Sequence, residues 1–259
     1  MSIDKIKKSD FIQSLEKGLN VIAIFDSEHQ AMTLTEVAKK VGLTRANARR
    51  ILLTLQYLDY VKYKDGKLFS LTAKVLCLGY SFLSSLSFKE LAQPYIQALA
   101  MDINESCSMS VLDGKDIVYV ARFQTKRIMT ISLSIGSRLP LHATSMGRVL
   151  MSGLAQNDLE KVLDNLELEA YTPHTITNKQ ELGDRIHLVK ERGWALADQE
   201  LEIGVRSIAC PVKDKDGKTI AALNISGHAS RVTKEEMIEN YLPTLKRTVK
   251  EIENALHKL

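Results

Sequence analysis

The chain has 259 residues, of which 45% are hydrophobic, 25% charged and 6% aromatic. This composition is typical of a globular protein and excludes a fibrous or largely disordered chain. No apolar run reaches the roughly 18 residues of a membrane span, and the basic N-terminus lacks the apolar core of a secretory signal. Cys77, Cys107 and Cys210 fit neither a disulfide framework nor a short metal-ligand spacing. We therefore expect a protein of the reducing cytoplasm, with no membrane partner, metal or cofactor.

The net charge of +4 is unevenly distributed. Residues 1–70 contain 12 Lys or Arg against 8 Asp or Glu, whereas the rest of the chain holds 23 of each sign. A basic N-terminal part joined to a neutral C-terminal part suggests a polyanion-binding head on a body with another task. An ordinary solvated surface can carry the same small surplus, so the charge is only a first indication.

The first two predicted elements are helices. Apolar residues recur every three or four positions over residues 10–28, which predicts a helix with Asp10 as its cap. Residues 33–42 predict a second, shorter helix, with Thr33 or Thr35 as its cap. It is expected to end in the left-handed turn that its terminal glycine permits.

A third helix is predicted over residues 45–58, with Thr44 as its cap. Gly42 would supply the turn before it, and Ala48 and Ile51 would seat its inner face, which is the spacing of a helix-turn-helix. The residues expected to project outward and to contact DNA are Thr44, Arg45, Asn47, Arg49 and Arg50.

Residues 60–71 alternate around Asp65 and Gly66, a dipeptide favoured in tight hairpins. Three helices and a basic hairpin together predict a winged helix-turn-helix over residues 1–72, with double-stranded DNA as its partner. Arginine can bond guanine and asparagine adenine, while a helix N-terminus suits a phosphate. The hairpin residues expected to contact phosphates are Lys62, Lys64 and Lys67. For each of these side chains, a merely solvated position is the alternative.

Residues 73–88 predict a linker helix with an unusual lack of charge. The 14 residues 75–88 contain no charged side chain. An uncharged helix is expected to be buried, so we predict that this segment mediates self-association. Packing within its own chain is the alternative.

Residues 89–259 are predicted to form an antiparallel sheet flanked by helices, so the whole chain belongs to the α+β class. Helices are expected at 88–104, 144–154, 156–166, 178–192 and 233–257, strands at 109–112, 117–121, 128–135, 194–197, 205–212 and 219–226, and a loop around Pro140.

Polar side chains interrupt the apolar faces of two of these strands. In the strand 219–226, Asn224 and Ser226 share one face, and Ser207 lies between small apolar residues on the neighbouring strand. A cavity with few convergent polar groups suits a small carboxylated ligand. Polar residues that bond one another inside the domain are the alternative.

Arg122 ends an apolar strand and is expected on the face of Val118 and Val120. An inward arginine there can pair with a ligand carboxylate, and an internal ion pair is the alternative. The scattered histidines show no metal-ligand spacing, so no metal site is predicted.

Four stretches form a combination typical of one family. They are Ser-Leu-Glu-Lys-Gly-Leu-Asn-Val-Ile at 14–22, Leu-Thr-Arg-Ala-Asn-Ala-Arg-Arg-Ile-Leu-Leu-Thr-Leu at 43–55, Arg-Leu-Pro-Leu-His-Ala-Thr-Ser-Met-Gly-Arg at 138–148 and Leu-Asn-Ile-Ser-Gly at 223–227. Over nearly its whole length the chain resembles the IclR family of bacterial transcription regulators. The stretches Val-Leu-Asp-Gly at 111–114 and Ile-Val-Tyr-Val-Ala-Arg at 117–122 resemble the branch that controls aromatic-acid breakdown through the β-ketoadipate pathway.

The resemblance implies a winged helix-turn-helix, a linker helix and a GAF-like effector domain, in dimers that pair further on the operator. It also implies that the backbone of Ser145 and Met146 lines the effector, and that the side chains of Ser207, Asn224 and Ser226 contact it. Arg122 joins this predicted effector site from its place on the strand.

We interpret the chain as a transcriptional regulator, dimeric or tetrameric, that senses a small aromatic acid or β-ketoadipate-pathway metabolite and controls catabolic genes. A regulator responding to a non-aromatic carboxylic acid is the nearest alternative. An enzyme is disfavoured because the sequence has no Gly-rich phosphate loop, nucleophile elbow or HExxH motif. A ligand-independent architectural DNA-binding protein would leave residues 89–259 without a task.

Overall fold

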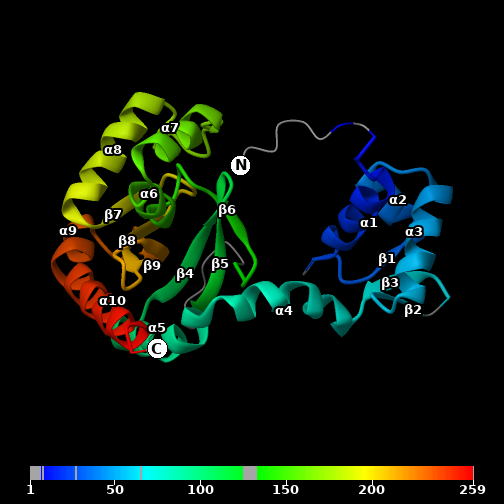
Figure 1. The fold of residues 1–259 in the computed structure, drawn as a ribbon, viewed down its shortest axis with the longest axis horizontal. Helices are drawn as coiled ribbons and strands as arrows, with labels where there is room; N and C mark the ends of the chain where they lie inside the picture. Colours follow the sequence, from blue (N-terminus) through cyan, green and yellow to red (C-terminus); the bar gives the residue numbers. More distant parts are fainter. Residues whose placement is uncertain (1–6, 8, 27, 65, 125–132, 259) are drawn as a thin grey trace. The chain divides into compact units, whose positions relative to one another are not determined.

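The computed structural model describes residues 7, 9–26, 28–64, 66–124 and 133–258. The chain divides into two compact units, Met1–Ser85 and Leu86–Leu259 (Figure 1). Among the described helices, none has the length and apolar character needed to cross a membrane.

The N-terminal unit is a winged helix-turn-helix, as predicted. Its elements are α1 (Gln13–Ala23), β1 (Met32–Thr33), α2 (Leu34–Val41), α3 (Arg45–Tyr57), β2 (Val61–Lys64) and β3 (Leu68–Leu71), with the strands in the order β1-β3-β2. Thr33 caps α2 in a reciprocal capping box with Glu36, and Gly42 ends the helix at φ 69°. The Thr44 hydroxyl accepts the Asn47 amide at 3.3 Å and caps α3.

Two details of this unit differ from the prediction. The first helix begins at Gln13 with Ile12 at its N-cap position, so Asp10 does not cap it, and it ends at Ala23. Strand β1 was not predicted, because two residues are too few to give a recognisable alternation. It pairs with β3 through Met32 and Phe69 and places both side chains in the apolar core.

The predicted linker helix is divided by the structure. A 3-10 turn, η1 (Ala73–Val75), leads into α4 (Leu76–Ser85), and α5 (Ser87–Ile103) begins after Leu86. None of the α4 side chains is buried. Four large ones have exposed fractions of 75%, 51%, 69% and 49%: Leu76, Leu78, Tyr80 and Phe82.

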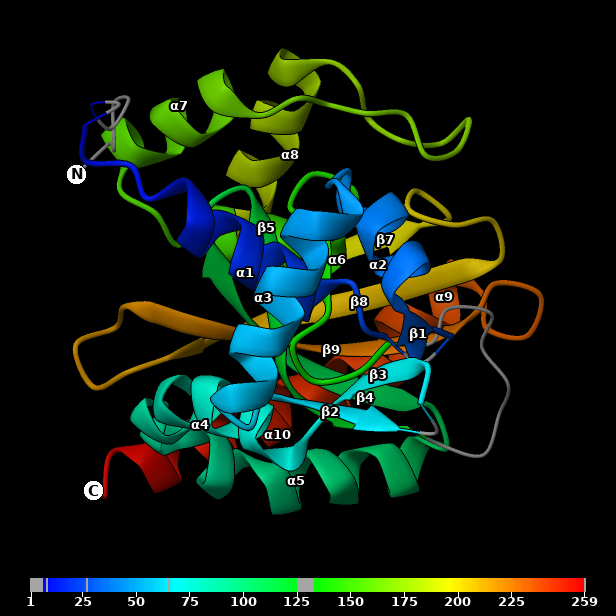
Figure 2. The same ribbon diagram turned by 90° about the vertical axis from the view of Figure 1, so that its right-hand side faces the viewer.

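The C-terminal unit is built on one antiparallel sheet of six strands in the order β6-β5-β4-β9-β8-β7. The strands are β4 (Ser106–Asp113), β5 (Asp116–Phe123), β6 (Arg138–Pro140), β7 (Ala195–Asp198), β8 (Val205–Lys213) and β9 (Thr219–His228). Helices α6 (Ser145–Ser152), α7 (Gln156–Asn165) and α8 (Lys179–Arg192) cover one face, while α5 and α10 (Leu242–Leu256) cover the other (Figures 1 and 2). The α+β class is confirmed.

Three segments of this unit add detail to the prediction or lie outside the described residues. The strand predicted over 128–135 lies mostly outside the described residues. The loop predicted around Pro140 contains the edge strand β6, a position that tolerates the missing N–H of proline. The helix predicted over 233–257 is confirmed as one unbroken helix, in which α9 (Lys234–Glu236), a π-helical turn (Met237–Tyr241) and α10 follow one another directly. Pro243, near the start of α10, cannot donate a helical hydrogen bond, which accounts for the change of register.

Helix α6 lies unusually close to the chain before it. A Cβ atom added to Gly147 would lie 2.1 Å from the backbone oxygen of Leu141. Only glycine therefore fits in this turn of α6. Gly183 in α8 is the opposite case, since an added Cβ there would meet nothing within 4 Å.

This contrast gives a prediction about stability. Gly147→Ala should lower the free energy of unfolding by about 1–3 kcal/mol or more, because the backbone of Leu141 has to move. Gly183→Ala should raise it by about 0.5–1 kcal/mol, because the unfolded chain loses conformational freedom. Urea unfolding of both variants checks the prediction, and equal effects would contradict the close approach.

Candidate functional sites

The outward residues of α3 all have exposed side chains but do not form one patch. Asn47 and Arg50 line a groove of about 640 Å³ between α1 and α3, which Lys17 also borders. Arg45 and Arg49, one turn apart, do not line this groove. The helix thus presents two basic flanks, while Ala48 and Leu52 hold its inner side in the core.

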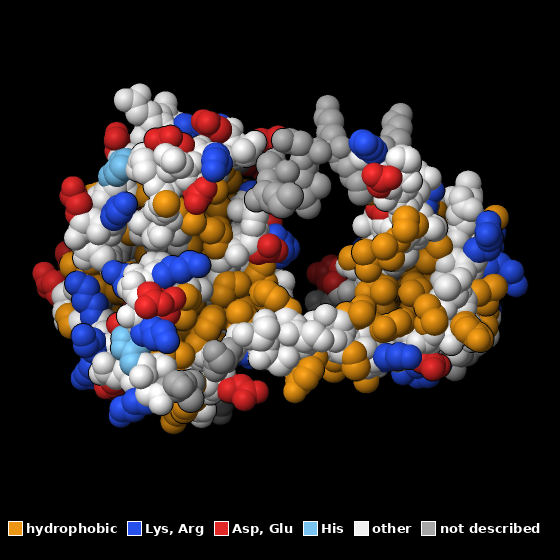
Figure 3. Space-filling model, in the orientation of Figure 1, with side chains coloured by type: hydrophobic (Ala, Val, Ile, Leu, Met, Phe, Trp, Pro, Cys, Tyr) orange, Lys and Arg blue, Asp and Glu red, His pale blue; other side chains and the backbone are white. Residues whose placement is uncertain are grey.

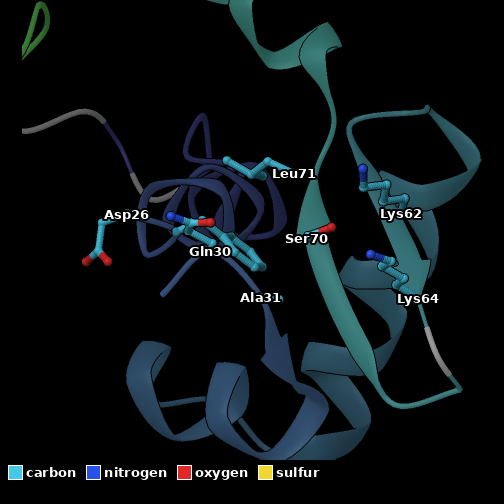
Figure 4. A pocket seen from close by; sticks show the side chains of 8 residues that line it. Asp26, Gln30, Ala31, Lys62, Lys64, Ser70 and Leu71 are labelled. Atoms are coloured by element: carbon cyan, nitrogen blue, oxygen red, sulfur yellow. The ribbon is translucent and has the colours of Figure 1, made fainter. Parts of the chain in front are cut away.

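The wing carries a second basic surface. Lys62 and Lys64 project from β2 on the same side as Ser70 of β3, since Lys62 and Ser70 are paired in register (Figure 4). They border a hollow of about 470 Å³, with Asp26 and Gln30 across from them. The buried Ser70 hydroxyl has no hydrogen-bond partner among the described residues. Lys67 is exposed outside this hollow.

In the C-terminal unit, a small cavity lies between the central sheet and α6. The residues predicted to bind the effector all line it: Arg122, Ser145, Met146, Ser207, Asn224 and Ser226. The sequence reasoning missed the other lining residues, which are Tyr119, Leu133, Leu139, Ala143, Thr144, Ala197, Glu200, Leu201 and Val205. Several of these lie in loops or are apolar, so no polar pattern marked them.

Some polar groups of the cavity bond one another. The Ser145 and Ser207 hydroxyls lie 2.8 Å apart, which joins α6 to β8. The Asn224 amide nitrogen donates to the Ser226 hydroxyl at 2.9 Å. The Asn224 side-chain oxygen is buried and accepts no hydrogen bond from the described part of the chain.

Arg122 reaches this cavity because of a β-bulge. Met109 of β4 pairs with Ala121, but the next residue, Ser110, pairs with Tyr119. The extra residue reverses the alternation of β5, so Arg122 faces the cavity with Tyr119 and does not share the face of Val118. The predicted face was therefore wrong, because simple alternation does not register a bulge.

The Arg122 guanidinium is incompletely bonded. Its Nε atom and one of its Nη atoms are buried and have no hydrogen-bond partner within the described ranges. Burial lowers the pKa of Arg122, and burial also raises the pKa of the neighbouring Tyr119 to about 12. The side chain thus brings a poorly solvated positive charge to the cavity.

The cavity is narrow, with a volume of about 40 Å³. A cavity of about 10–15 Å³ already holds one water molecule, so this one admits only a few, and a ring-sized ligand requires the walls to move. Met146 can change shape most readily because its thioether side chain is unbranched. Its sulfur accepts a hydrogen bond from Ser110 at 3.1 Å.

Behind the cavity lies a buried ion pair. Arg148 of α6 donates to Glu200 at 2.8 Å and to the backbone oxygen of His142 at 3.0 Å. Both charged side chains are almost fully buried. The pair connects α6 to the segment that follows β7, and Glu200 itself lines the cavity. No group of three or more His, Cys, Asp or Glu among the described residues is placed to hold a metal ion.

Comparison with known proteins matches both units to one family. The IclR helix-turn-helix domain matches residues 14–65, and the bacterial transcriptional regulator IclR C-terminal domain matches residues 80–254. The Pca regulon regulatory protein of Pseudomonas putida is 40% identical over 237 residues, which cover 91% of this chain and 81% of that protein. The chain belongs to the IclR family.

Solved structures agree with this assignment. A transcriptional regulator from Rhodococcus sp. RHA1 is 48% identical, with a TM-score of 0.84 over 96% of this chain and 99% of that one. The inducer-binding domain of the Acinetobacter PobR transcription factor, solved as a double mutant with 3-hydroxybenzoic acid, is 34% identical. Its TM-score is 0.60 over 64% of this chain and 97% of that domain. This IclR-family protein is a transcriptional regulator with an N-terminal DNA-binding unit.

Proposed function

We propose that this IclR-family regulator binds an operator through α3 and the wing, and that a small aromatic acid in the α6 cavity alters this binding. Controlling catabolic genes from the cytoplasm would be its task. The observation that carries the proposal is the Arg122 guanidinium, which brings to the cavity two buried nitrogen atoms that have no partner among the described residues.

A carboxylate is the ligand group that best satisfies this guanidinium. Leaving a buried charge without a partner is costly, and arginine binds carboxylates through two parallel hydrogen bonds. The side-chain oxygen of Asn224, which no described residue bonds, can accept a hydrogen bond from a ring hydroxyl of the same ligand. A ligand that carries both groups would satisfy all three atoms at once.

The rest of the cavity suits an aromatic ring. Tyr119, Leu133, Leu139 and Met146 supply apolar surface, and the hydroxyl pair of Ser145 and Ser207 can rearrange to meet a substituent. The hydroxybenzoic acid bound to the related PobR domain has this chemistry. A non-aromatic carboxylic acid could use the same guanidinium but would leave more of the apolar wall uncovered.

Sensing is a better interpretation of the cavity than catalysis. Ser145 and Ser207 hydrogen-bond each other, and no histidine is among the described residues that line the cavity. A serine nucleophile needs an adjacent base, so the pair has no means of activation. We therefore propose that the bound acid dissociates without being chemically changed.

The DNA-binding proposal predicts selective losses. Arg49→Ala and Arg50→Ala should each weaken operator binding while the thermal stability stays nearly constant, because both side chains are exposed. Loss of a phosphate contact should reduce the salt slope by about one, and loss of a base contact should cost about 1–3 kcal/mol on the operator alone. Fluorescence anisotropy against operator and random duplexes measures both effects. Arg247→Ala, on α10, is the matched control, and parental affinity in both α3 variants would refute the assignment.

The ligand proposal predicts opposite effects on stability and affinity. Arg122→Met should raise the unliganded free energy of unfolding by about 1 kcal/mol, since it removes two buried nitrogen atoms that have no partner among the described residues. Calorimetric affinity for 4-hydroxybenzoate should fall at least about tenfold, and Asn224→Ala should cost a similar factor. Operator binding without ligand should persist in both variants. Arg247→Met controls for loss of a charge, and unchanged affinity in both cavity variants would place the ligand elsewhere.

We also propose that two copies associate through α4 and the exposed face of α1. Large apolar side chains gather over α1 in Figure 3, and Leu15 and Leu19 line one groove with Leu78 of α4. Dimers of helix-turn-helix proteins bind two half-sites, which gives this surface a task on the operator. This use of residues 73–88 would join the DNA-binding part, 1–72, to the effector-binding part, 89–259.

The dimer proposal predicts that Phe82→Asp gives a monomer, because an unpaired charge in an apolar interface is disfavoured. Ser81→Asp adds the same charge to the polar side of α4 and should leave the dimer intact. Light scattering and sedimentation measure the mass, with circular dichroism as a check on folding. A folded Phe82→Asp dimer would show that α4 does not mediate association.

A further inference from the structure

A second cavity lies on the far side of the Arg148–Glu200 pair from the narrow cavity. Its volume is about 260 Å³, and Glu200 lines both cavities. Helix α8 and strand β7 form its walls. The charged residues that line it are Arg148, Glu181, Arg185, Arg192, Asp198, Glu200 and Lys234.

The carboxylates of this cavity already have cationic partners. Glu200 is bonded by Arg148 at 2.8 Å, and Arg185 lies 4.0 Å from Glu181. Asp198 has two partners, Lys234 at 2.9 Å and Arg206 at 2.7 Å. The acidic groups therefore have little capacity left for a metal cation.

Arg192 is the lining cation that no described carboxylate bonds. Its Nε donates to the backbone oxygen of Trp194 at 2.7 Å, and its guanidinium stacks 3.7 Å from the centre of the Trp194 ring. These contacts hold the guanidinium in one orientation, and its terminal nitrogens donate no hydrogen bond within the described part of the chain. Burial and the charges of Arg185 and Arg148 lower the pKa of Arg192, so three guanidiniums influence the same region.

Arg148 adds a second observation that points to an anion. This side chain is 3% exposed, and its buried Nε has no hydrogen-bond partner within the described chain. An anion in the cavity would give Arg192 the negative partner that the described carboxylates do not supply, and carboxylate or phosphate oxygens match its planar donors.

We propose that this cavity binds a small carboxylate or phosphate anion through Arg192 and Arg185, and that the bound anion alters the effector cavity through the Arg148–Glu200 pair. The proposed effect on the effector cavity rests on the function proposed above, whereas the proposed anion binding does not.

The connection between the cavities is short. Helix α6 begins with Ser145 and Met146 in the effector cavity, and Arg148 lies one turn further along the same helix. An anion near Arg148 competes with Glu200 for its guanidinium, which changes the position of Glu200 in the effector cavity. Because coupling between two sites is reciprocal, each ligand must change the affinity of the other by the same factor.

The first test is direct binding to the full chain at constant ionic strength. Inorganic phosphate and succinate are titrated separately by calorimetry, with chloride as the background anion, so that the two chemistries are distinguished. Saturable binding of either is the expected result. Arg192→Gln should lower the affinity for the anion at least about tenfold. Arg192→Lys keeps the charge but loses the two parallel donors of the guanidinium, so its affinity should lie between those of the parent protein and Arg192→Gln.

The controls separate a site from general charge effects. Lys190→Gln removes one positive charge from the exposed side of α8 and should leave anion binding unchanged. Arg185→Gln is a second variant of the site, in case Arg192→Gln fails to fold. Absence of saturable binding of both anions, or equal losses in the Lys190 and Arg192 variants, would overturn the proposal.

The second test measures the affinity for 4-hydroxybenzoate with and without the saturating anion. A shift of several fold that Arg192→Gln removes is expected. An unchanged affinity would overturn the coupling. If 4-hydroxybenzoate fails to bind while the anion still binds through Arg192, the effector proposal fails and the anion site stands.

Discussion

The buried ion pair between Arg148 and Glu200 is the constraint on which the C-terminal unit depends. Two charges removed from water are tolerated only when each is bonded, and here the guanidinium reaches a carboxylate and the His142 backbone oxygen. The pair holds α6 against the segment after β7, and the close approach of Gly147 to the Leu141 backbone fixes the distance between the helix and the chain before it. Ser145 and Met146 therefore face the sheet in a defined position.

The two inward arginines of this unit differ in how well they are bonded, and that difference separates structure from function. Arg148 bonds Glu200 and a backbone oxygen and leaves one buried nitrogen, its Nε, without a described partner, whereas Arg122 leaves two buried nitrogens without a partner among the described residues. A fold keeps such a costly group only where something else compensates for it. The same reasoning applies to Asn224, whose side-chain nitrogen is bonded to Ser226 while its side-chain oxygen has no partner among the described residues.

The N-terminal unit differs from the C-terminal unit because the side chains proposed to bind DNA are exposed. Its apolar core is small, and the packing of Val37, Ala48 and Leu52 positions α2 and α3 without involving the outward residues. The basic groups of α3 and the wing are therefore free to serve recognition without a cost to stability. The exposed apolar side chains of α4 are an exception, because their exposure to water is unfavourable.

The sequence by itself determined the local features. Thr33, Gly42 and Thr44 mark the ends of α2 and α3 because capping and left-handed turns depend on neighbouring residues only, and alternation identified the strands that carry Ser207 and Asn224. Only the tertiary structure decided which way Arg122 faces, because the bulge opposite Met109 and Ser110 depends on pairing between strands. It also decided the partner of Arg148, since Glu200 is 52 residues away and no local pattern specifies so distant a contact.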